Sequence, residues 1–421
     1  MSELNLTHSN GNKVKLTTPD TLAASKTFKL PGTDGSEGQV LQTDGSGALS
    51  FSTVSDYSNR NLIINGACFV AQRGQQTGRT DGFGGPDRFR FQSNYSAVTM
   101  SQSTDVPTGQ GFAKSLKLDV TTAGGDSNAS TYTQIDYRFE GQELARLKYG
   151  TSSAETTTLS FWIKSPKAGT HWVRLYGDEL SNGGAAFISR KYTVSSANTW
   201  QKVSLSFPGF TSDGFNNDNT TGMRISWYFA QGSDYSSGTA QADDGGWLNW
   251  ADASDRARNT VGQVNCFDST SNDIFITGVQ YEVGSLATPF EHRHPSMELL
   301  SCQRYFKRMR GAVGGGSGYG SAGDGVVCTM ANWTSSASYG LLPLGVEMRY
   351  APKLTGFANL NYFSAGNTWA PGSSSQCYLA GSSYDRVELT LQGFSMTQGH
   401  AGWLRIDNTN GYMDFEAELD T

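Results

Sequence analysis

The chain of 421 residues is long enough for two or three domains with cores of their own, because single cores seldom grow to this size. Fifty glycines and an aromatic content of 12% exclude a disordered chain and indicate many turns between aromatic-rich strands. A formal net charge of −6 excludes the basic surface that phosphate recognition requires, so we expect no nucleic acid partner.

Cysteine usage and hydropathy indicate a protein without disulfides or membrane segments. Five cysteines at wide, irregular spacing match neither a disulfide framework nor a metal pattern, so we expect reduced, mostly buried thiols. No run of eighteen apolar residues occurs, and the opening MSELNLTHSNGNKVKL lacks the apolar core of a signal peptide. We therefore expect synthesis in a cytoplasm and no insertion into a membrane. The cysteines are Cys68, Cys266, Cys302, Cys328 and Cys377.

Residues 1–57 carry short alternating runs, such as 13–16 and 27–30, separated by proline, glycine and aspartate. Their apolar area is too small for an independent core. We therefore expect this N-terminal segment to become ordered through other copies of itself or through a larger assembly.

Residues 58–294 contain a long series of strand-like runs with regular turns. The runs 158–164 and 172–176 are joined by a turn with proline and glycine, which predicts a hairpin. Because no helical period separates the runs, the pattern predicts a β-sandwich of the jelly-roll type. The other clear runs are 200–207, 222–229 and 273–279.

One amphipathic helix is predicted over residues 295–310. Ser296 could cap its start, and basic residues near its end suit the helix dipole. Four apolar residues recur at helical spacing, so they would share one face and pack on a sandwich. These residues are Leu299, Cys302, Phe306 and Met309.

A glycine-rich run over 311–318 follows this helix, and its composition predicts a hinge or linker. Beyond it, the runs 326–330, 386–391 and 403–406 predict a second β-domain within 311–421. The expected fold class is all-β, with an N-terminal oligomeric β collar, a central jelly-roll β-sandwich, one connector helix and a C-terminal β-domain.

Five motifs occur once each, in this order along the chain: LPGTDGSEGQVL with a later DGSG and phenylalanine, NLIING with QRG and PDRF, LSFWIKS, ITGVQYEVG with TPFE, and CQRYF. In combination they resemble phage tail-fibre and related virion fibre proteins, especially those of marine and cyanobacterial phages. The resemblance covers residues 30–309, and the last hundred or so residues match nothing that we can name. It implies a homotrimer that is fixed to the virion by residues 1–57, with a carbohydrate-binding-like jelly roll and outer domains that point outward.

The glycine-rich segment near the start also has a physical reading as a trimerisation collar. Glycines permit positive φ and close approach of chains, so three copies could turn together about an axis with apolar side chains inside. The alternative is a flexible surface linker, in which these apolar residues would serve no purpose. The collar consists of Gly32, Gly35, Gly38, Val40, Leu41, Leu49 and Phe51.

A long loop at 234–259 is the main candidate for glycan recognition. Aromatic rings stack on sugar faces while polar side chains bind hydroxyl groups, and this loop is rich in both kinds of residue. The alternative is that Trp247 and Trp250 fold the loop onto its own sandwich or a neighbouring subunit, with the carboxylates in solvent. The candidates are Tyr235, Asp243, Asp244, Trp247, Trp250 and Arg256.

The same carboxylates permit a rival hypothesis, a glycan-degrading depolymerase in which Asp243 and Asp244 act as acid and base. Such acids are common in any acidic loop, however, and no catalytic histidine or cysteine set accompanies them. The chain also lacks the repeat of a parallel β-helix. We therefore expect a structural fibre subunit that binds a host-surface glycan or receptor, with neither enzymatic activity nor a cofactor.

The oxygen-rich segment 213–219 is a weak calcium candidate through Asp213, Asn216 and Asp218, because hard cations prefer such ligands. It lacks the glycine and terminal glutamate of a helix-loop-helix calcium loop. A polar turn, in which these side chains bind their own backbone, is the alternative. We therefore expect no metal site.

The fibre resemblance implies that the protein is part of the virion. We expect it to be attached to the tail, and attachment to the neck or the capsid is the alternative.

Overall fold

The structure is a computed structural model that describes residues 3–7, 13–17, 27–36, 39–43, 46–53, 59–178, 180–181, 183–311, 325–406 and 410–419. The chain divides into two compact units, Met1–Asn59 and Arg60–Thr421. Every pair of named strands is antiparallel, and the helices are short. The predicted all-β class is confirmed.

The first unit contains two hairpins in its described residues. β1 (Glu3–Thr7) pairs with β2 (Lys13–Thr17), and β3 (Gln39–Thr43) pairs with β4 (Leu49–Thr53). The segment before β3 is tied to the second hairpin, since the amide of Leu49 donates to the carbonyl of Lys29 at 2.8 Å.

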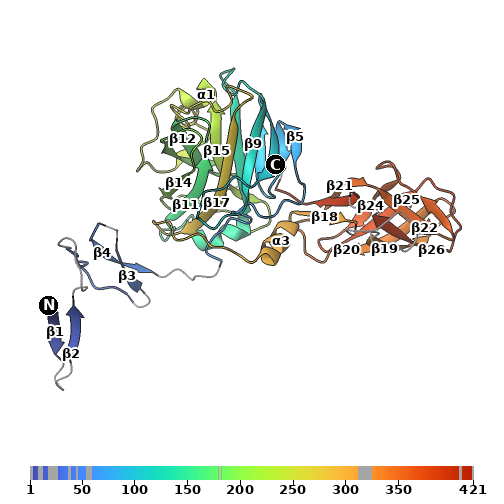
Figure 1. The fold of residues 1–421 in the computed structure, drawn as a ribbon, viewed down its shortest axis with the longest axis horizontal. Coiled ribbons are helices and arrows are strands. Elements are labelled where there is room, and N and C mark those ends of the chain that lie inside the picture. The colour runs from blue at the N-terminus through green and yellow to red at the C-terminus, as the bar shows by residue number, and fades with distance from the viewer. Residues whose placement is uncertain are drawn as a thin grey trace. The chain divides into compact units, whose positions relative to one another are not determined.

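A sandwich of two sheets begins the second unit (Figure 1). The six-stranded sheet has the order β14-β11-β17-β9-β8-β5, and the seven-stranded sheet has the order β16-β13-β12-β15-β10-β7-β6. The first sheet comprises β5 (Gln76–Arg79), β8 (Ala97–Ser103), β9 (Ser115–Thr122), β11 (Thr157–Lys164), β14 (Gln201–Phe207) and β17 (Asp273–Val283). The second comprises β6 (Asp81–Phe83), β7 (Arg90–Ser93), β10 (Tyr132–Glu140), β12 (Gly169–Gly177), β13 (Ala186–Val194), β15 (Thr221–Gln231) and β16 (Leu248–Asn249).

The core of the sandwich lies between these sheets and follows from strand alternation. On β15, Ile225 and Trp227 point inward and belong to one large buried cluster. The Trp227 ring meets the Phe161 ring of the opposite sheet edge-on, with centroids 5.8 Å apart. Side chains at the intervening positions of β15 therefore point to the other face of the seven-stranded sheet, where the candidate site lies.

Two connections between the long strands contain short helices. η1 (Gly141–Leu147) follows β10, and the segment 232–263 contains α1 (Ser233–Ser236), β16 and α2 (Ala253–Arg256). Across the described part of the chain, no helix is long and apolar enough to cross a membrane.

The connector helix is shorter than its sequence pattern predicts. α3 (Pro295–Gln303) is capped by His294, whose Nδ1 accepts from the Ser296 amide, rather than by Ser296 itself. The prediction of helix beyond Gln303 is wrong, because β18 (Phe306–Arg310) pairs with β27 (Tyr412–Glu416).

Long-range contacts explain why the helix stops. Arg308 on β18 binds Asp414 on β27 through its Nε at 2.6 Å, and the guanidinium of Arg73 lies 3.6 Å from the centre of the Phe306 ring. These partners come from distant parts of the chain, so they outweigh a helical period that continues through Phe306 and Met309.

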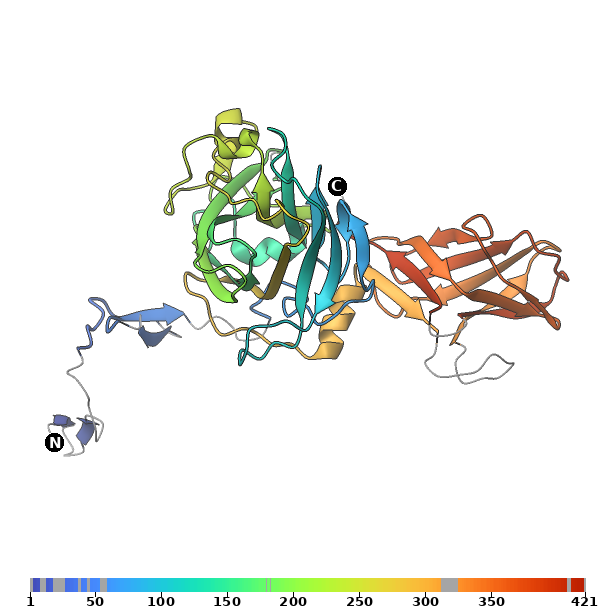
Figure 2. The ribbon, with the colours of Figure 1, turned by 45° about the horizontal axis from the view of Figure 1, so that its top comes forward.

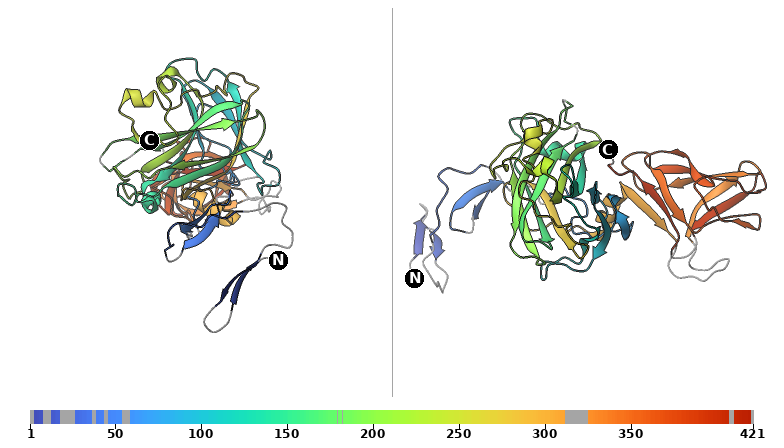
Figure 3. Two further views of the ribbon diagram at one scale, coloured as in Figure 1. Left: turned by 90° about the vertical axis from the view of Figure 1, so that its left-hand side faces the viewer. Right: turned by 90° about the horizontal axis from the view of Figure 1, so that it is seen from above.

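The C-terminal domain consists of two further sheets and a core of its own (Figure 3). A seven-stranded sheet has the order β23-β22-β26-β19-β20-β25-β24, and a three-stranded sheet has the order β18-β27-β21. The strands not yet given are β19 (Gly325–Asn332), β20 (Ala337–Pro343), β21 (Lys353–Ala358), β22 (Leu360–Ser364), β23 (Asn367–Trp369), β24 (Cys377–Ser382), β25 (Arg386–Gln392) and β26 (Ala401–Ile406). All five cysteines of the chain are buried and unpaired, as predicted.

After β27 the chain returns to the sandwich (Figure 2). The amide of Ala417 donates to the carbonyl of Tyr305 at 2.7 Å, and Arg138 donates to the carbonyl of Leu419 at 2.8 Å. Between them, the buried Glu418 carboxylate binds Arg73 and Arg88. This tail segment therefore joins the two β-domains through buried ion pairs.

Candidate functional site

The outer face of the seven-stranded sheet carries cross-strand rows of polar and aromatic side chains. Residues opposite one another in an antiparallel ladder project to the same side, so the register identifies each row. One row runs Gln92, Gln134, Tyr228 and Trp172, the next runs Arg90, Asp136, Ser226 and Arg174, and a third runs Arg138, Arg224 and Tyr176.

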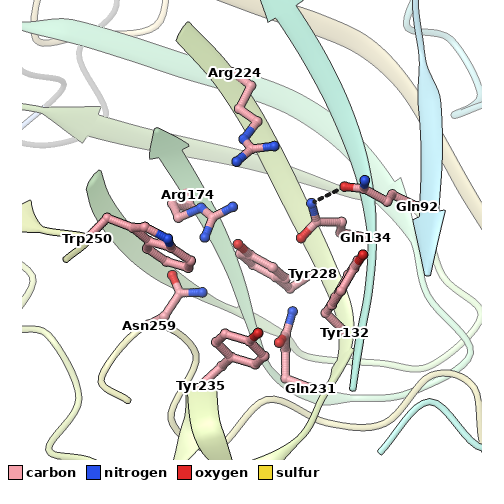
Figure 4. A pocket seen from close by; sticks show the side chains of 10 residues that line it. All are labelled: Gln92, Tyr132, Gln134, Arg174, Arg224, Tyr228, Gln231, Tyr235, Trp250 and Asn259. Atoms are coloured by element: carbon pink, nitrogen blue, oxygen red, sulfur yellow. Dashed lines mark hydrogen bonds between the residues drawn. The ribbon is translucent and has the colours of Figure 1, made fainter. Parts of the chain in front are cut away.

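A pocket of about 210 Å³ opens over these rows (Figure 4). Its floor comes from β7, β10, β12 and β15, and its wall comes from the segment 232–263. The lining residues are Gln92, Tyr132, Gln134, Arg174, Arg224, Tyr228, Gln231, Tyr235, Trp250 and Asn259.

Several hydrogen bonds fix the segment 232–263 against the sheet. The indole nitrogen of Trp172 donates to the carbonyl of Val261 at 3.0 Å, and the hydroxyl of Ser189 donates to the side-chain oxygen of Asn259 at 2.6 Å. Arg256 donates to the carbonyl of Trp250 at 2.9 Å. The wall of the pocket is therefore held in place before any ligand binds.

Aromatic rings form one end of the pocket. The Trp250 ring meets the Tyr176 and Phe187 rings edge-on, with centroids 5.1 and 5.4 Å apart. Tyr235 lies parallel to Trp250 at 6.4 Å, with 9° between the planes. Trp250 and Tyr235 are half-buried, so each retains surface that a ligand could cover.

Buried polar groups form the floor, and some of them have no partner. Arg174 is 3% exposed, and among the described residues its side chain makes neither a hydrogen bond nor an ion pair. Both amide atoms of Gln231 are likewise buried and unpaired. Neighbouring Arg224 does have a partner, since it lies 3.3 Å from the Asp178 carboxylate. Buried polar atoms are nearly always hydrogen-bonded, so this floor has unused capacity for a ligand.

Burial also shifts the pKa values of this floor. It lowers the pKa of the Arg174 guanidinium and raises the pKa of the Asp178 carboxyl, because desolvation disfavours the charged form of each group. The rings of Tyr176, Tyr228 and Trp250 lie 4.6 to 5.2 Å from the Arg174 guanidinium carbon, so their π faces replace part of its lost hydration.

Only some of the residues predicted from the sequence to bind glycan lie at the pocket. Tyr235 and Trp250 line the pocket, and Arg256 supports the backbone beside it. Asp243 and Asp244 are exposed and lie outside the pocket, with Asp243 3.7 Å from Lys191.

Trp247 also lies outside the pocket. It packs on the sandwich core, with its ring 4.9 Å from Phe210, and its indole nitrogen donates to the carbonyl of Pro208 at 3.0 Å. Trp247 therefore anchors the loop on its own sandwich, as the alternative interpretation has it, whereas Trp250 faces the pocket.

The residues of the pocket floor were not predicted from the sequence. The run 222–229 alternates, so Arg224 and Tyr228 fall on one face while Ile225 and Trp227 fall on the core face. This alternation is the sequence signal for the outer face of β15. It does not predict the pocket floor, because the floor also depends on how β7, β10, β12 and β15 pair. The lining residues that were not predicted are Gln92, Tyr132, Gln134, Arg174, Arg224, Tyr228 and Gln231 on the floor and Asn259 on the wall.

The oxygen-rich segment has the contacts of a polar turn. The Asp213 carboxylate accepts from the Gly214 amide at 2.8 Å, and the Asp218 carboxylate accepts from the amide and hydroxyl of Thr220 at 2.9 and 2.6 Å. Asn216 is exposed. Within the ranges that the structure describes, no group of three or more histidine, cysteine, aspartate or glutamate side chains could hold a metal ion.

The collar residues lie in the β3–β4 hairpin and the segment before it. Val40, Leu41 and Phe51 are 47%, 51% and 39% exposed in the single chain, and Leu49 is half-buried. Gly35 approaches the Phe51 ring so closely that an added Cβ would lie 2.7 Å from it, whereas Gly32 has open space. Gly38 lies outside the described residues.

No protein-family profile and no curated protein sequence matches the chain. Among solved structures, it is similar to an enzymatically active domain of tailspike protein 4 of bacteriophage CBA120, with a TM-score of 0.29 and 14% identity over 56% of this chain and 23% of that one. It is also similar to a family 11 carbohydrate-binding module of a Clostridium thermocellum cellulase, with a TM-score of 0.26 and 15% identity over 52% of this chain and 98% of that module. A third similarity is to a xylan-binding domain of Paenibacillus barcinonensis, with a TM-score of 0.24 and 12% identity over 46% and 91% of the two chains. The chain thus spans less than a quarter of the tailspike structure.

Proposed function

We propose that the chain is a non-enzymatic fibre subunit of a phage particle that binds bacterial surface glycan in the pocket of its central sandwich. The observation that carries the proposal is the pocket itself. Half-buried Trp250 and Tyr235 stand at one end of it, and buried polar groups without partners, on Arg174 and Gln231, lie on its floor.

This combination suits a sugar ring for physical reasons. One face of a sugar is apolar and can lie against an aromatic ring, while its hydroxyl groups need donors and acceptors. Gln231 offers both, and Arg174 offers donors, at positions where no group in the described part of the chain satisfies them. A ligand that pairs with these groups relieves a desolvation cost already present in the free protein.

The lining favours binding over hydrolysis. Glycoside hydrolysis generally needs a pair of carboxyl groups beside the scissile bond. Of the described residues that line the pocket, none is aspartate or glutamate, and Asp243 and Asp244 are exposed outside it. We expect no new reducing ends when the purified protein is incubated with host polysaccharide, and their appearance would revive the depolymerase alternative.

The fibre role and the homotrimer rest on the motif resemblance and on the first unit. In the single chain, Val40, Leu41 and Phe51 leave apolar surface exposed on a small hairpin, and threefold association would cover it. In this proposal residues 1–57 attach to another virion protein, and the sandwich and C-terminal domain reach toward the cell.

Binding of fluorescent protein to host cells tests the pocket. Trp250→Ala removes a pocket ring, so we expect binding to fall at least tenfold at a temperature at which the melting curve shows the variant to be folded. Trp333→Ala is the matched control, because Trp333 is an exposed tryptophan of the C-terminal domain. Unchanged binding by Trp250→Ala, together with a loss in Trp333→Ala, would move the receptor site to the C-terminal domain.

A further inference from the structure

The charges behind the pocket do not balance. Beside it lie three arginines, Arg138, Arg174 and Arg224, and two aspartates, Asp136 and Asp178. With both carboxyl groups ionised, this set carries one surplus positive charge. Other charges nearby are already paired, since Arg90 holds Asp81 through two bonds of 2.8 Å and exposed Lys191 lies near Asp243.

The three arginines of this set differ in their partners. Arg224 lies 3.3 Å from Asp178, and Arg138 donates to the carbonyl of Leu419 at 2.8 Å. Asp136 accepts from the Gln134 amide at 2.9 Å. Among the described residues, Arg174 is the one of the three arginines whose side chain makes neither a hydrogen bond nor an ion pair, and Trp250, its nearest ring, also forms the wall of the pocket. Figure 4 shows its guanidinium beside Trp250 and Tyr228.

We propose that the pocket selects acidic saccharides, with a single carboxylate or sulfate group of the bound sugar paired to Arg174 and the sugar ring placed against Trp250 and Tyr235. This inference rests on the proposed function of the pocket and adds the class of glycan to it. Guanidinium groups present a planar fork of donors that matches such oxyanions. The surplus of one charge favours a monoanion over a dianionic phosphate, which would leave one negative charge without a partner.

Matched sugar pairs test this selectivity. The probes are oligogalacturonate and its carboxyl-reduced form, and 3-O-sulfated lactose and lactose, so the members of each pair differ in their anionic groups. We expect the wild type to bind at least one acidic probe tenfold or more tightly than its neutral twin. The pair with the larger ratio identifies carboxylate or sulfate as the preferred group.

Variants of Arg174 test whether this residue of the pocket causes the preference for acidic saccharides. Arg174→Gln should remove the preference for the acidic twin, Arg174→Lys should retain part of it, and Arg386→Gln, which removes a charge in the C-terminal domain, should leave it unchanged. The melting temperature of Arg174→Gln should equal or exceed that of the wild type, because a buried charge without a partner is lost. A lower melting temperature would make Arg174 a structural residue and overturn the proposal.

The outcomes separate this inference from the proposed function. Equal affinity for the acidic and neutral members of each pair, with both affinities lost in Trp250→Ala, would overturn the preference for acidic saccharides. The proposed saccharide site would then remain supported. Acid selection that persists in Arg174→Gln would place the anion elsewhere and also overturn the inference. Failure of every probe and of host cells to bind would overturn the proposed function together with it.

Discussion

Glu418 is a buried carboxylate whose oxygens bind two arginines of the sandwich. It is 1% exposed and lies 3.1 Å from Arg73 and 2.7 Å from Arg88. We expect Glu418→Gln to lower the free energy of unfolding by about 3–5 kcal/mol, because it leaves buried guanidinium groups uncompensated. Urea unfolding followed by tryptophan fluorescence measures the change.

Glu416 provides the control for that prediction. It also binds Arg73, at 3.0 Å, but its side chain is 23% exposed, so solvent screens the pair. We expect Glu416→Gln to cost about 1 kcal/mol or less. Equal losses in the two variants would contradict the importance of burial at Glu418.

His171 makes stability depend on pH. Burial lowers the pKa of its imidazole from 6.5 to about 4 in the folded chain. The unfolded chain therefore binds a proton first as the pH falls, and the free energy of unfolding decreases between about pH 6.5 and pH 4. Over this window we expect the wild type to lose about 3 kcal/mol more than His171→Gln. Parallel pH profiles of urea unfolding would show that His171 ionises in the folded state as it does in water.

The individual residues of the pocket were only partly predictable. Tyr235 and Trp250 could be found because aromatic residues in a long polar loop are a local signal. Arg174 could not, because a charged residue in a strand is expected to face solvent, and only the overlying loop makes it buried.

At the scale of elements, Trp247 anchors the loop that walls the pocket. Its ring packs on Phe210 and Tyr149, and its indole nitrogen is hydrogen-bonded. We expect Trp247→Ala to lower the free energy of unfolding by about 2–4 kcal/mol, with Trp247→Phe recovering part of it. Chemical denaturation measures both, and an unchanged value in Trp247→Ala would show that the ring is dispensable to the loop.

The predicted helix over 295–310 shows the limit of local patterns. Its first part forms as the proline and the first-turn glutamate suggest, and this much could be predicted. Its second part satisfies a helical period equally well but pairs with β27, more than a hundred residues later. No window of sequence around Phe306 contains that partner.

At the scale of the whole molecule, residues 1–59 and the sandwich are expected to contribute separately to binding. Because the first unit is compact by itself, a chain of residues 60–421 should keep its affinity for a single soluble glycan within about twofold. We expect its binding to cells to fall by roughly a hundredfold or more, since trimer avidity is lost.

Light scattering and cell binding, measured on the same samples, check this prediction. A monomeric full-length chain would contradict the proposed trimer. A trimeric shortened chain would place the association in the second unit instead.

The class of the fold was predictable, and its topology was not. Alternating runs such as 222–229 indicate strands wherever they occur, because one face of each strand must be apolar. The order of the strands depends on pairings such as β10 with β15 and β12 with β15, which join residues far apart in the sequence. Such pairings leave no mark on either strand alone.

The tail segment has a consequence for synthesis. Arg73 precedes its partner Glu418 by 345 residues, which a ribosome working at roughly 5–20 residues per second covers in on the order of tens of seconds. During that interval Arg73, Arg88 and Arg138 have no tail to bind, so the buried ion pairs and the hydrogen bond that hold the tail form only after the C-terminal domain has been made.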